Sequence, residues 1–147
     1  MRTLTMTVAG AARPQGSKSA FVINGRAILV ESNKDLKKAR AGVSNTIQQE
    51  AYFEKWARVE RPHEARLTVC FSFEPPKSWS KKKRDEAMAG LIPHTVKPDT
   101  DKLIRYLLDA ITDAGNVWED DSQVTLIYAQ KVYGPASYIK FAVDADV

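Results

Sequence analysis

The chain has 147 residues, of which 44% are hydrophobic and 27% charged, and its formal net charge is +4. We expect residues 1–147 to form a single domain, because a chain of this length buries enough surface to need no disulfide or structural metal. The single cysteine, the absence of long apolar runs and the weakly basic N-terminus exclude disulfide-rich secreted, membrane and signal-peptide-bearing classes, and the composition excludes disordered and collagen-like chains. A cytoplasmic protein is therefore expected.

The N-terminal third predicts a strand and a hairpin. Alternating apolar and polar residues at positions 4–8 are typical of a strand, and a loop rich in Pro, Gly and Ser follows. Asn24 and Gly25 lie between two apolar segments. Because this pair accepts the positive φ angles of a tight turn, it predicts a β-hairpin over residues 21–30.

A long helix is expected next. Ser32 or Asn33 is a favourable N-cap, the helical pattern continues to about Arg58, and Pro62 excludes further helix. The expected apolar stripe consists of Leu36, Val43, Ile47, Tyr52 and Trp56.

Residues 67–73 predict a half-buried strand, in which large apolar residues alternate with small or polar ones until Pro75. Cys70 falls on the face opposite the large residues. Without a nearby base in the sequence, it is better interpreted as a packed small residue than as a nucleophile.

A short helix is expected over residues 81–89, capped by Ser78 or Ser80 and ended by Gly90. Its first turn holds four consecutive cations, which is the unfavourable sign for a helix N-terminus. Such a turn either forms a solvated face or offers positive charge to a polyanion, and the sequence leaves both interpretations open. The four cations are Lys81, Lys82, Lys83 and Arg84.

The C-terminal third begins with a strongly amphipathic helix over residues 99–114, ended by Gly115. A turn through Trp118 leads to a strand over residues 123–132, and a last strand covers residues 138–143. The order of elements predicts an α+β fold, in which a small mixed β-sheet with an N-terminal hairpin packs against three helices.

Charge is distributed unevenly along the chain. Residues 1–97 hold 18 Lys and Arg against 9 Asp and Glu, a net of +9, whereas residues 98–147 hold 4 against 9, a net of −5. This distribution suits a polyanionic partner. The basic part of the chain would attract the partner over a broad surface, and metal ions held by the acidic part would contact it locally. Ordinary solvated surface explains the excess of cations equally well.

Seven acidic residues fall within residues 99–121. Carboxylates that approach one another have raised pKa values unless a cation lies between them, and their oxygens suit Mg²⁺ or Mn²⁺ better than zinc. Such ions can lower the pKa of a water molecule and stabilise a phosphoryl transition state. Singly, Asp99 is better interpreted as an N-cap and Asp120 and Asp121 as a polar turn; together with Asp101 and Asp109 they favour a metal site.

Two cations accompany these carboxylates. Arg105 lies one turn after Asp101, as either a helix salt bridge or a contact to a substrate phosphate. Lys131 lies ten residues after Asp121, and this even offset places both on one face of a regular strand, with the ammonium directed toward the carboxylates. A surface lysine is the alternative.

The segments 97–103, 108–110 and 120–124, followed by Lys131, resemble the RusA family of Holliday junction resolvases. The family pattern is K/R-P-D-x-D-N-L, then D-A-L, then D-D-x-Q-V and a lysine, and the match extends over about 35 residues. Segments 14–18 and 76–80 also resemble phage-borne members of the family.

The resemblance implies a RusA-like fold and a Mg²⁺-dependent endonuclease, with Mn²⁺ as the alternative cofactor, that resolves four-way junctions or other branched DNA. It implies in-line attack by a metal-activated water and a homodimer in the cytoplasm of a bacterial host, encoded by a phage or prophage. A two-fold dimer suits paired cuts in opposing strands. The implied metal ligands are Asp99, Asp101 and Asp121, with Asp120 beside them, and the implied catalytic residues are Asp99, Asp101, Asp121 and Arg105.

Two positions depart from the family pattern. Arg105 stands where the family has its catalytic lysine, and arginine keeps the charge and can bind phosphate but does not easily release a proton. Lys102 replaces the family asparagine. If the family lysine transfers a proton, either activity should fall or Lys102 must take over that role. The alternatives are therefore a branched-DNA-binding protein that has lost turnover and a structural domain stabilised by a cation.

Affinity for DNA would come largely from Lys and Arg contacts to phosphates, with junction shape supplying selectivity. His94, five residues before Asp99, either approaches the site or has no role. The expected DNA contacts are Lys18, Lys77, Lys81, Lys82, Lys83, Arg84, Lys97, Lys102 and Lys131.

Overall fold

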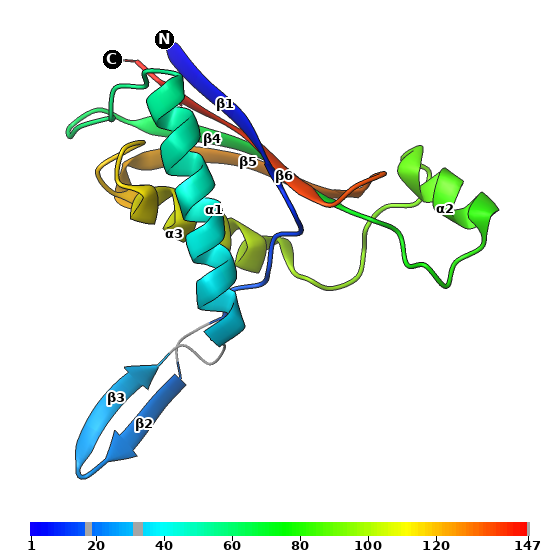
Figure 1. Ribbon diagram of the computed structural model, residues 1–147, viewed down its shortest axis with the longest axis horizontal. Helices are drawn as coiled ribbons and strands as arrows, with labels where there is room; N and C mark the ends of the chain where they lie inside the picture. The colour runs from blue at the N-terminus through cyan, green and yellow to red at the C-terminus, as the bar shows by residue number, and fades with distance from the viewer. Residues whose placement is uncertain (17–18, 31–33, 147) are drawn as a thin grey trace.

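The computed structural model describes residues 1–16, 19–30 and 34–146, and its centre is a four-stranded mixed sheet (Figure 1). The strand order is β1-β6-β4-β5, in which β6 runs antiparallel to both of its neighbours and β5 runs parallel to β4. β2 and β3 form a separate antiparallel hairpin. The strands are β1 (Arg2–Ala9), β2 (Ser19–Ile23), β3 (Arg26–Val30), β4 (Ala65–Phe73), β5 (Val124–Tyr133) and β6 (Tyr138–Ala145).

Helices α1 (Lys34–Phe53) and α3 (Thr100–Ala114) lie together on one face of the sheet, whereas α2 (Lys81–Met88) lies beyond its end (Figure 1). A short 3₁₀ helix, η1 (Asp121–Gln123), directly precedes β5. This arrangement confirms the α+β class and the order of elements expected from the sequence. No helix in the described part of the chain is long and apolar enough to cross a membrane.

The core lies between the sheet and the two helices, and the alternation of β1 explains why. Leu4, Met6 and Val8 are buried, while the threonines between them are exposed. α3 supplies the largest helical share of the core, since its apolar stripe faces the sheet. Its buried residues are Leu103, Tyr106, Leu107, Ala110, Ile111 and Ala114.

The expectation for α1 is partly wrong. The helix ends at Phe53 rather than near Arg58. Two residues after this end, Lys55 takes a positive φ of 54°, which a continuing helix does not allow. Tyr52, expected in the core, is 76% exposed. The buried face of α1 consists of Leu36, Ser44, Ile47 and Ala51, and Ser44 donates from its hydroxyl to the Ala110 carbonyl of α3 at 2.7 Å. Tyr52 follows Ala51 by one residue, a rotation of about 100° about the helix axis, and therefore lies off this face. The proposed caps Ser32 and Asn33 lie outside the described residues.

Local signals elsewhere are confirmed. Asn24 and Gly25 have φ angles of 51° and 77° at the hairpin turn, as the expected turn type requires. Gly115 ends α3 in the left-handed conformation, with φ of 83°. Cys70 is half-buried on the sheet face that the helices leave open, and burial raises its pKa, so it is not an activated thiol.

Candidate functional site

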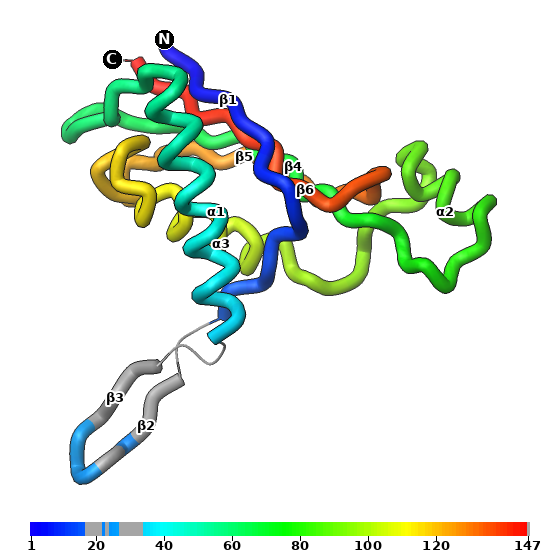
Figure 2. The backbone as a smooth tube through the Cα atoms, in the orientation of Figure 1, coloured from blue at the N-terminus to red at the C-terminus, as the bar shows by residue number. Residues whose placement is uncertain are grey.

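The start of α3 is positioned by β5. Residues 91–98 return from α2 to α3 (Figure 2), and the Lys131 ammonium donates to the backbone carbonyls of Val96 and Pro98, the latter at 2.7 Å. The expectation that Lys131 and Asp121 share one strand face is wrong, because Asp121 belongs to η1 and precedes the strand. Lys131 instead fixes the backbone immediately before Asp99.

Asp99 holds the N-cap position of α3, but its side chain makes no capping hydrogen bond. Its carboxylate is exposed and lies 3.6 Å from the Lys102 ammonium. Asp101, in the first turn, is exposed as well. The Asp99 side chain therefore does not perform the capping role expected for it. Both carboxylates face solvent at the N-terminal end of α3, which is the positive end of the helix dipole.

Arg105 lies on the exposed side of α3, one turn after Asp101 and one turn before Asp109. No ion pair joins Arg105 to Asp101 within the described residues, so the helix salt bridge considered from the sequence is not formed. The guanidinium is therefore available to an external anion on the same helix face as two carboxylates.

A buried glutamine connects the N-terminal loop to this helix. Gln15 is 6% exposed; its amide nitrogen donates to Asp109, and its amide oxygen accepts from the Arg40 guanidinium at 2.7 Å. Its backbone N–H donates to the Lys102 carbonyl at 3.2 Å. The sequence analysis missed Gln15 as a site residue, although it lies in segment 14–18, which resembles the family, and in a loop rich in Pro and Gly.

The turn that carries Asp120 and Asp121 is fixed by a second buried glutamine, Gln123. Its side-chain oxygen accepts from the backbone N–H groups of Glu119 and Asp120, both at 2.9 Å. Its side-chain nitrogen donates to the carbonyls of residues 59 and 63. Asp120 and Gln123 form a capping box, and the Asp-x-x-Gln spacing could have identified this role in the sequence.

The two adjacent aspartates of this turn differ in their electrostatics. Hydrogen bonds from Ser122 lower the pKa of Asp120, whose carboxylate also lies 3.3 Å from the Arg61 guanidinium. Burial raises the pKa of Asp121, and the negative charges of Asp120 and Asp109 raise it further. Asp120 therefore already has partners, whereas Asp121 would be stabilised by an added cation.

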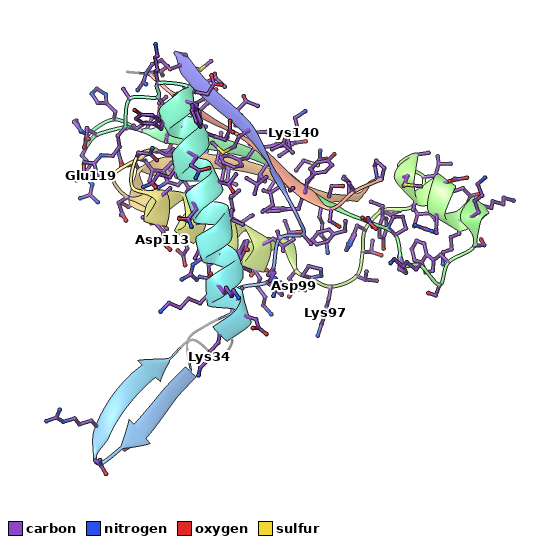
Figure 3. The ribbon with its side chains drawn as sticks, in the orientation of Figure 1. Lys34, Lys97, Asp99, Asp113, Glu119 and Lys140 are labelled. Atoms are coloured by element: carbon purple, nitrogen blue, oxygen red, sulfur yellow. The ribbon has the colours of Figure 1, made fainter. Side chains whose placement is uncertain are left out.

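Within one chain the acidic residues form two separate pairs. Figure 3 shows Asp99 and Glu119 at opposite ends of α3. Asp101 and Asp109 are eight residues apart, which is about 12 Å along a helix axis. Among the described residues no three His, Cys, Asp or Glu side chains are grouped closely enough to hold a metal ion. One pair is Asp99 with Asp101, and the other is Asp109 with Asp121.

A groove of about 520 Å³ borders Asp99 of the first pair. Lys97, Asp99 and Lys102 contribute its charged groups, and Pro14 belongs to the loop that Gln15 holds on α3. Two of the expected DNA contacts therefore lie together beside Asp99, where positive charge would attract a phosphate.

Five more of the expected DNA contacts lie on and around α2, whereas Lys131 lies on β5 and is bonded to the loop before α3. Ser80 caps this helix by accepting from the Lys83 backbone N–H at 3.2 Å, and the Lys83 ammonium lies 4.0 Å above the Trp79 ring. Lys77, Lys81 and Lys82 are exposed and Arg84 is half-buried, while Lys18 lies outside the described residues.

His94 does not approach the carboxylates. It is buried against Tyr133, with ring centroids 4.4 Å apart, and Trp79 packs on the same tyrosine. Burial lowers the pKa of His94, and the nearby charge of Lys131 lowers it further. The imidazole is thus a neutral packing group that joins α2 to the end of β5.

Comparison with known proteins agrees with this arrangement. Residues 8–143, nearly the whole chain, match the family model described as endodeoxyribonuclease RusA. The chain is also similar to the uncharacterized protein YqaN of Bacillus subtilis (strain 168), with 39% identity over 54 residues. That match covers 37% of this chain and 37% of the relative, so it spans little more than a third of the relative's length. Because the family model covers nearly the whole chain, including both glutamine-supported segments and every acidic residue of the site, the chain belongs to the endodeoxyribonuclease RusA family.

Proposed function

We propose that this protein is a Mg²⁺-dependent, structure-specific endodeoxyribonuclease that resolves Holliday junctions or other branched DNA by paired hydrolysis of phosphodiester bonds. The observation that carries the proposal is the start of α3, in a chain of the RusA family. There Asp99 and Asp101 are exposed, Asp99 makes no capping bond, and a groove lined by Asp99 and two lysines lies at the start of the helix.

The donor chemistry fits Mg²⁺ or Mn²⁺, because the groups concerned are carboxylate oxygens. Mg²⁺ is commonly held by one or two carboxylates together with substrate phosphates and waters, so a pair of aspartates in one chain is sufficient. The raised pKa of Asp121 supports the proposal, since a cation would relieve the repulsion from Asp120 and Asp109. When bound, the cation would lower the pKa of a water molecule and offset negative charge on the phosphate.

The chain's own cations have distinct roles in this proposal. Lys97 and Lys102 attract the DNA backbone to the groove, and Arg105 binds a phosphate through two parallel N–H groups. Lys131 holds the loop before Asp99 through the carbonyls of residues 96 and 98. Arginine at position 105 suffices if its role is to bind and neutralise the phosphate rather than to transfer a proton.

The active unit is proposed to be a homodimer. A four-way junction has two-fold symmetry, and its resolution requires two cuts at symmetric positions. A dimer with two-fold symmetry presents two equivalent sites at a fixed separation, which a monomer does not.

The test is cleavage of a synthetic four-way junction by purified protein, with and without Mg²⁺, and with linear duplex as the control substrate. The key variant is Asp101→Asn. Its matched control is Asp113→Asn, three turns further along the same helix, where the carboxylate is paired with Arg40 at 3.5 Å. Symmetric, metal-dependent nicks that disappear in Asp101→Asn and persist in Asp113→Asn are expected. Absence of junction binding would refute the proposal.

A second function, binding of branched DNA without turnover, is favoured only by the presence of arginine at position 105. It predicts tight binding of the junction with no cleavage in Mg²⁺ or Mn²⁺. In that case Arg105→Lys, which restores a group able to release a proton, should restore cleavage.

A further inference from the structure

Gln15 is a buried polar residue in the loop that follows β1. Residues 10–16 run past the start of α3 on the way to the β2–β3 hairpin (Figure 2), and among them Ala12 and Gln15 are buried. Ala12 is apolar and belongs to the core. A buried side-chain amide, by contrast, needs hydrogen-bond partners, so the contacts of Gln15 indicate what this segment holds in place.

Two charged neighbours fix the orientation of the Gln15 amide. A guanidinium can only donate hydrogen bonds, and an ionised carboxylate can only accept them. The amide oxygen therefore faces Arg40, at 2.7 Å, and the amide nitrogen faces Asp109. Glutamine thus supplies one acceptor and one donor to partners of opposite charge, which neither glutamate nor an apolar residue of the same length does.

The carboxylate that Gln15 holds belongs to the second acidic pair. Asp109 is half-buried on α3, this helix contacts η1, and η1 begins with Asp121. Burial raises the pKa of Asp121, and the negative charges of Asp120 and Asp109 raise it further, as expected of carboxylates that lie near one another. Since such groups repel, the bond from Gln15 keeps Asp109 from turning away toward solvent.

The backbone of Gln15 supports the groove at the first acidic pair. Its N–H donates to the Lys102 carbonyl at 3.2 Å, and Pro14 lines the groove together with Asp99 and Lys102. The loop therefore contacts α3 at two levels, through its backbone near Asp99 and through a side chain near Asp109. A substitution at position 15 changes only the second contact, because the backbone N–H remains.

We propose that Gln15 is a positioning residue of the junction-cleaving site, which holds the Asp109 carboxylate beside Asp121 and so fixes the second acidic pair. It acts through Asp109, since its own side chain is only 6% exposed. The proposal rests on the proposed function for the reaction that this pair serves, whereas the contact between Gln15 and Asp109 can be tested without it.

Gln15→Glu tests the contact with Asp109, because it keeps the shape of the side chain and the bond to Arg40. The guanidinium favours the ionised form of the introduced carboxylate, which repels Asp109 instead of donating to it. We expect kcat for junction cleavage in Mg²⁺ to fall by about 10–100-fold, the effect of displacing a group in the site by about 1 Å. KM, and the Kd for the junction without metal, should change by less than about threefold, because the groove and its lysines are unchanged.

Ser44→Ala is the matched control for an effect on the fold alone. Ser44 is also 6% exposed, and its hydroxyl donates to the Ala110 carbonyl between the two helices, α1 and α3, that Gln15 connects. The control removes a buried hydrogen bond without reaching the acidic residues. It should lower stability in urea unfolding and keep the wild-type kcat, and circular dichroism verifies that each variant is folded.

The side-chain amide of Gln15 gives a readout that needs neither metal nor DNA. Its ¹H–¹⁵N NMR signals, assigned from their loss in Gln15→Glu, should exchange slowly with water, because the group is buried and hydrogen-bonded. Asp109→Asn should shift these signals. Asp101→Asn, about two turns earlier on the same helix, should leave them unchanged.

Three results would overturn the positioning role: a wild-type kcat in Gln15→Glu, an equal loss of kcat in Ser44→Ala, or Gln15 amide signals that do not respond to Asp109→Asn. A wild-type chain that cuts no junction, while its Gln15 signals respond to Asp109→Asn, refutes the proposed function and the reaction named here. The same result confirms that Gln15 holds Asp109.

Discussion

Lys131 joins β5 to the loop that precedes the acidic pair of α3, and Lys131→Met removes this connection while keeping the side-chain stem. The half-buried ammonium donates to the carbonyls of Val96 and Pro98. A hydrogen bond from a charged group contributes about 1.5–3 kcal/mol. Because the released carbonyls can partly bind water instead, we expect the two bonds together to contribute about 2–3 kcal/mol to the free energy of unfolding.

Urea unfolding measures this loss of stability. The matched control is Lys140→Met, since Lys140 is an exposed lysine on β6 of the same sheet. A second readout is the imidazole of His94, whose pKa is lowered by burial and then by the charge of Lys131. Its pKa, followed by NMR, should rise in Lys131→Met and stay unchanged in the control. If both variants lose less than about 0.5 kcal/mol, the ordinary effect of a surface substitution, the anchoring role of Lys131 is refuted.

Three further predictions concern the site, the core and α2. The folded state raises the pKa of Asp121 above its ordinary value of 3.8, so the ionised carboxylate lowers stability at neutral pH and this effect is lost as the pH falls below 3.8. Asp121→Asn should therefore raise the Tm at pH 7 without added metal, and an unchanged Tm would contradict the pKa assignment. Leu107→Ala, at a fully buried position, should cost about 2–5 kcal/mol in urea unfolding, whereas exposed Leu91→Ala should cost less than about 0.5. Ser80→Ala should destabilise α2 by about 1 kcal/mol through the lost bond to the Lys83 N–H, seen as faster amide exchange confined to α2; uniform acceleration would show that α2 does not open separately.

The elements that the sequence predicted well have strong local signals. Asn24 and Gly25 fix the hairpin turn, Ser80 begins α2, and Gly115 ends α3, because each residue satisfies a backbone requirement at its own position. The end of α1 lacked such a signal. Tyr52 fitted the helical period, but the buried face of α1 is formed by Leu36, Ser44, Ile47 and Ala51, and the direction of that face depends on the partner helix.

The site was less predictable, since its geometry depends on contacts between distant segments. The spacing of Asp121 and Lys131 assumed an uninterrupted strand, whereas η1 separates Asp121 from it. Gln15 reaches Asp109 across 94 positions of sequence, and no local pattern encodes that meeting. The types of residue at the site were thus visible in the sequence, while their grouping into two pairs was not.

The connection through Lys131 also means that one strand sets the distance between the two acidic pairs. Asp121 begins η1, which leads directly into the N-terminal end of β5, and Asp99 is fixed through Lys131 near the C-terminal end of the strand. Each strand residue adds about 3.3 Å, and an insertion of one residue reverses the face of every side chain beyond it. A single insertion within β5 would therefore turn Lys131 away from the loop, so the length of this strand is constrained even at its exposed positions.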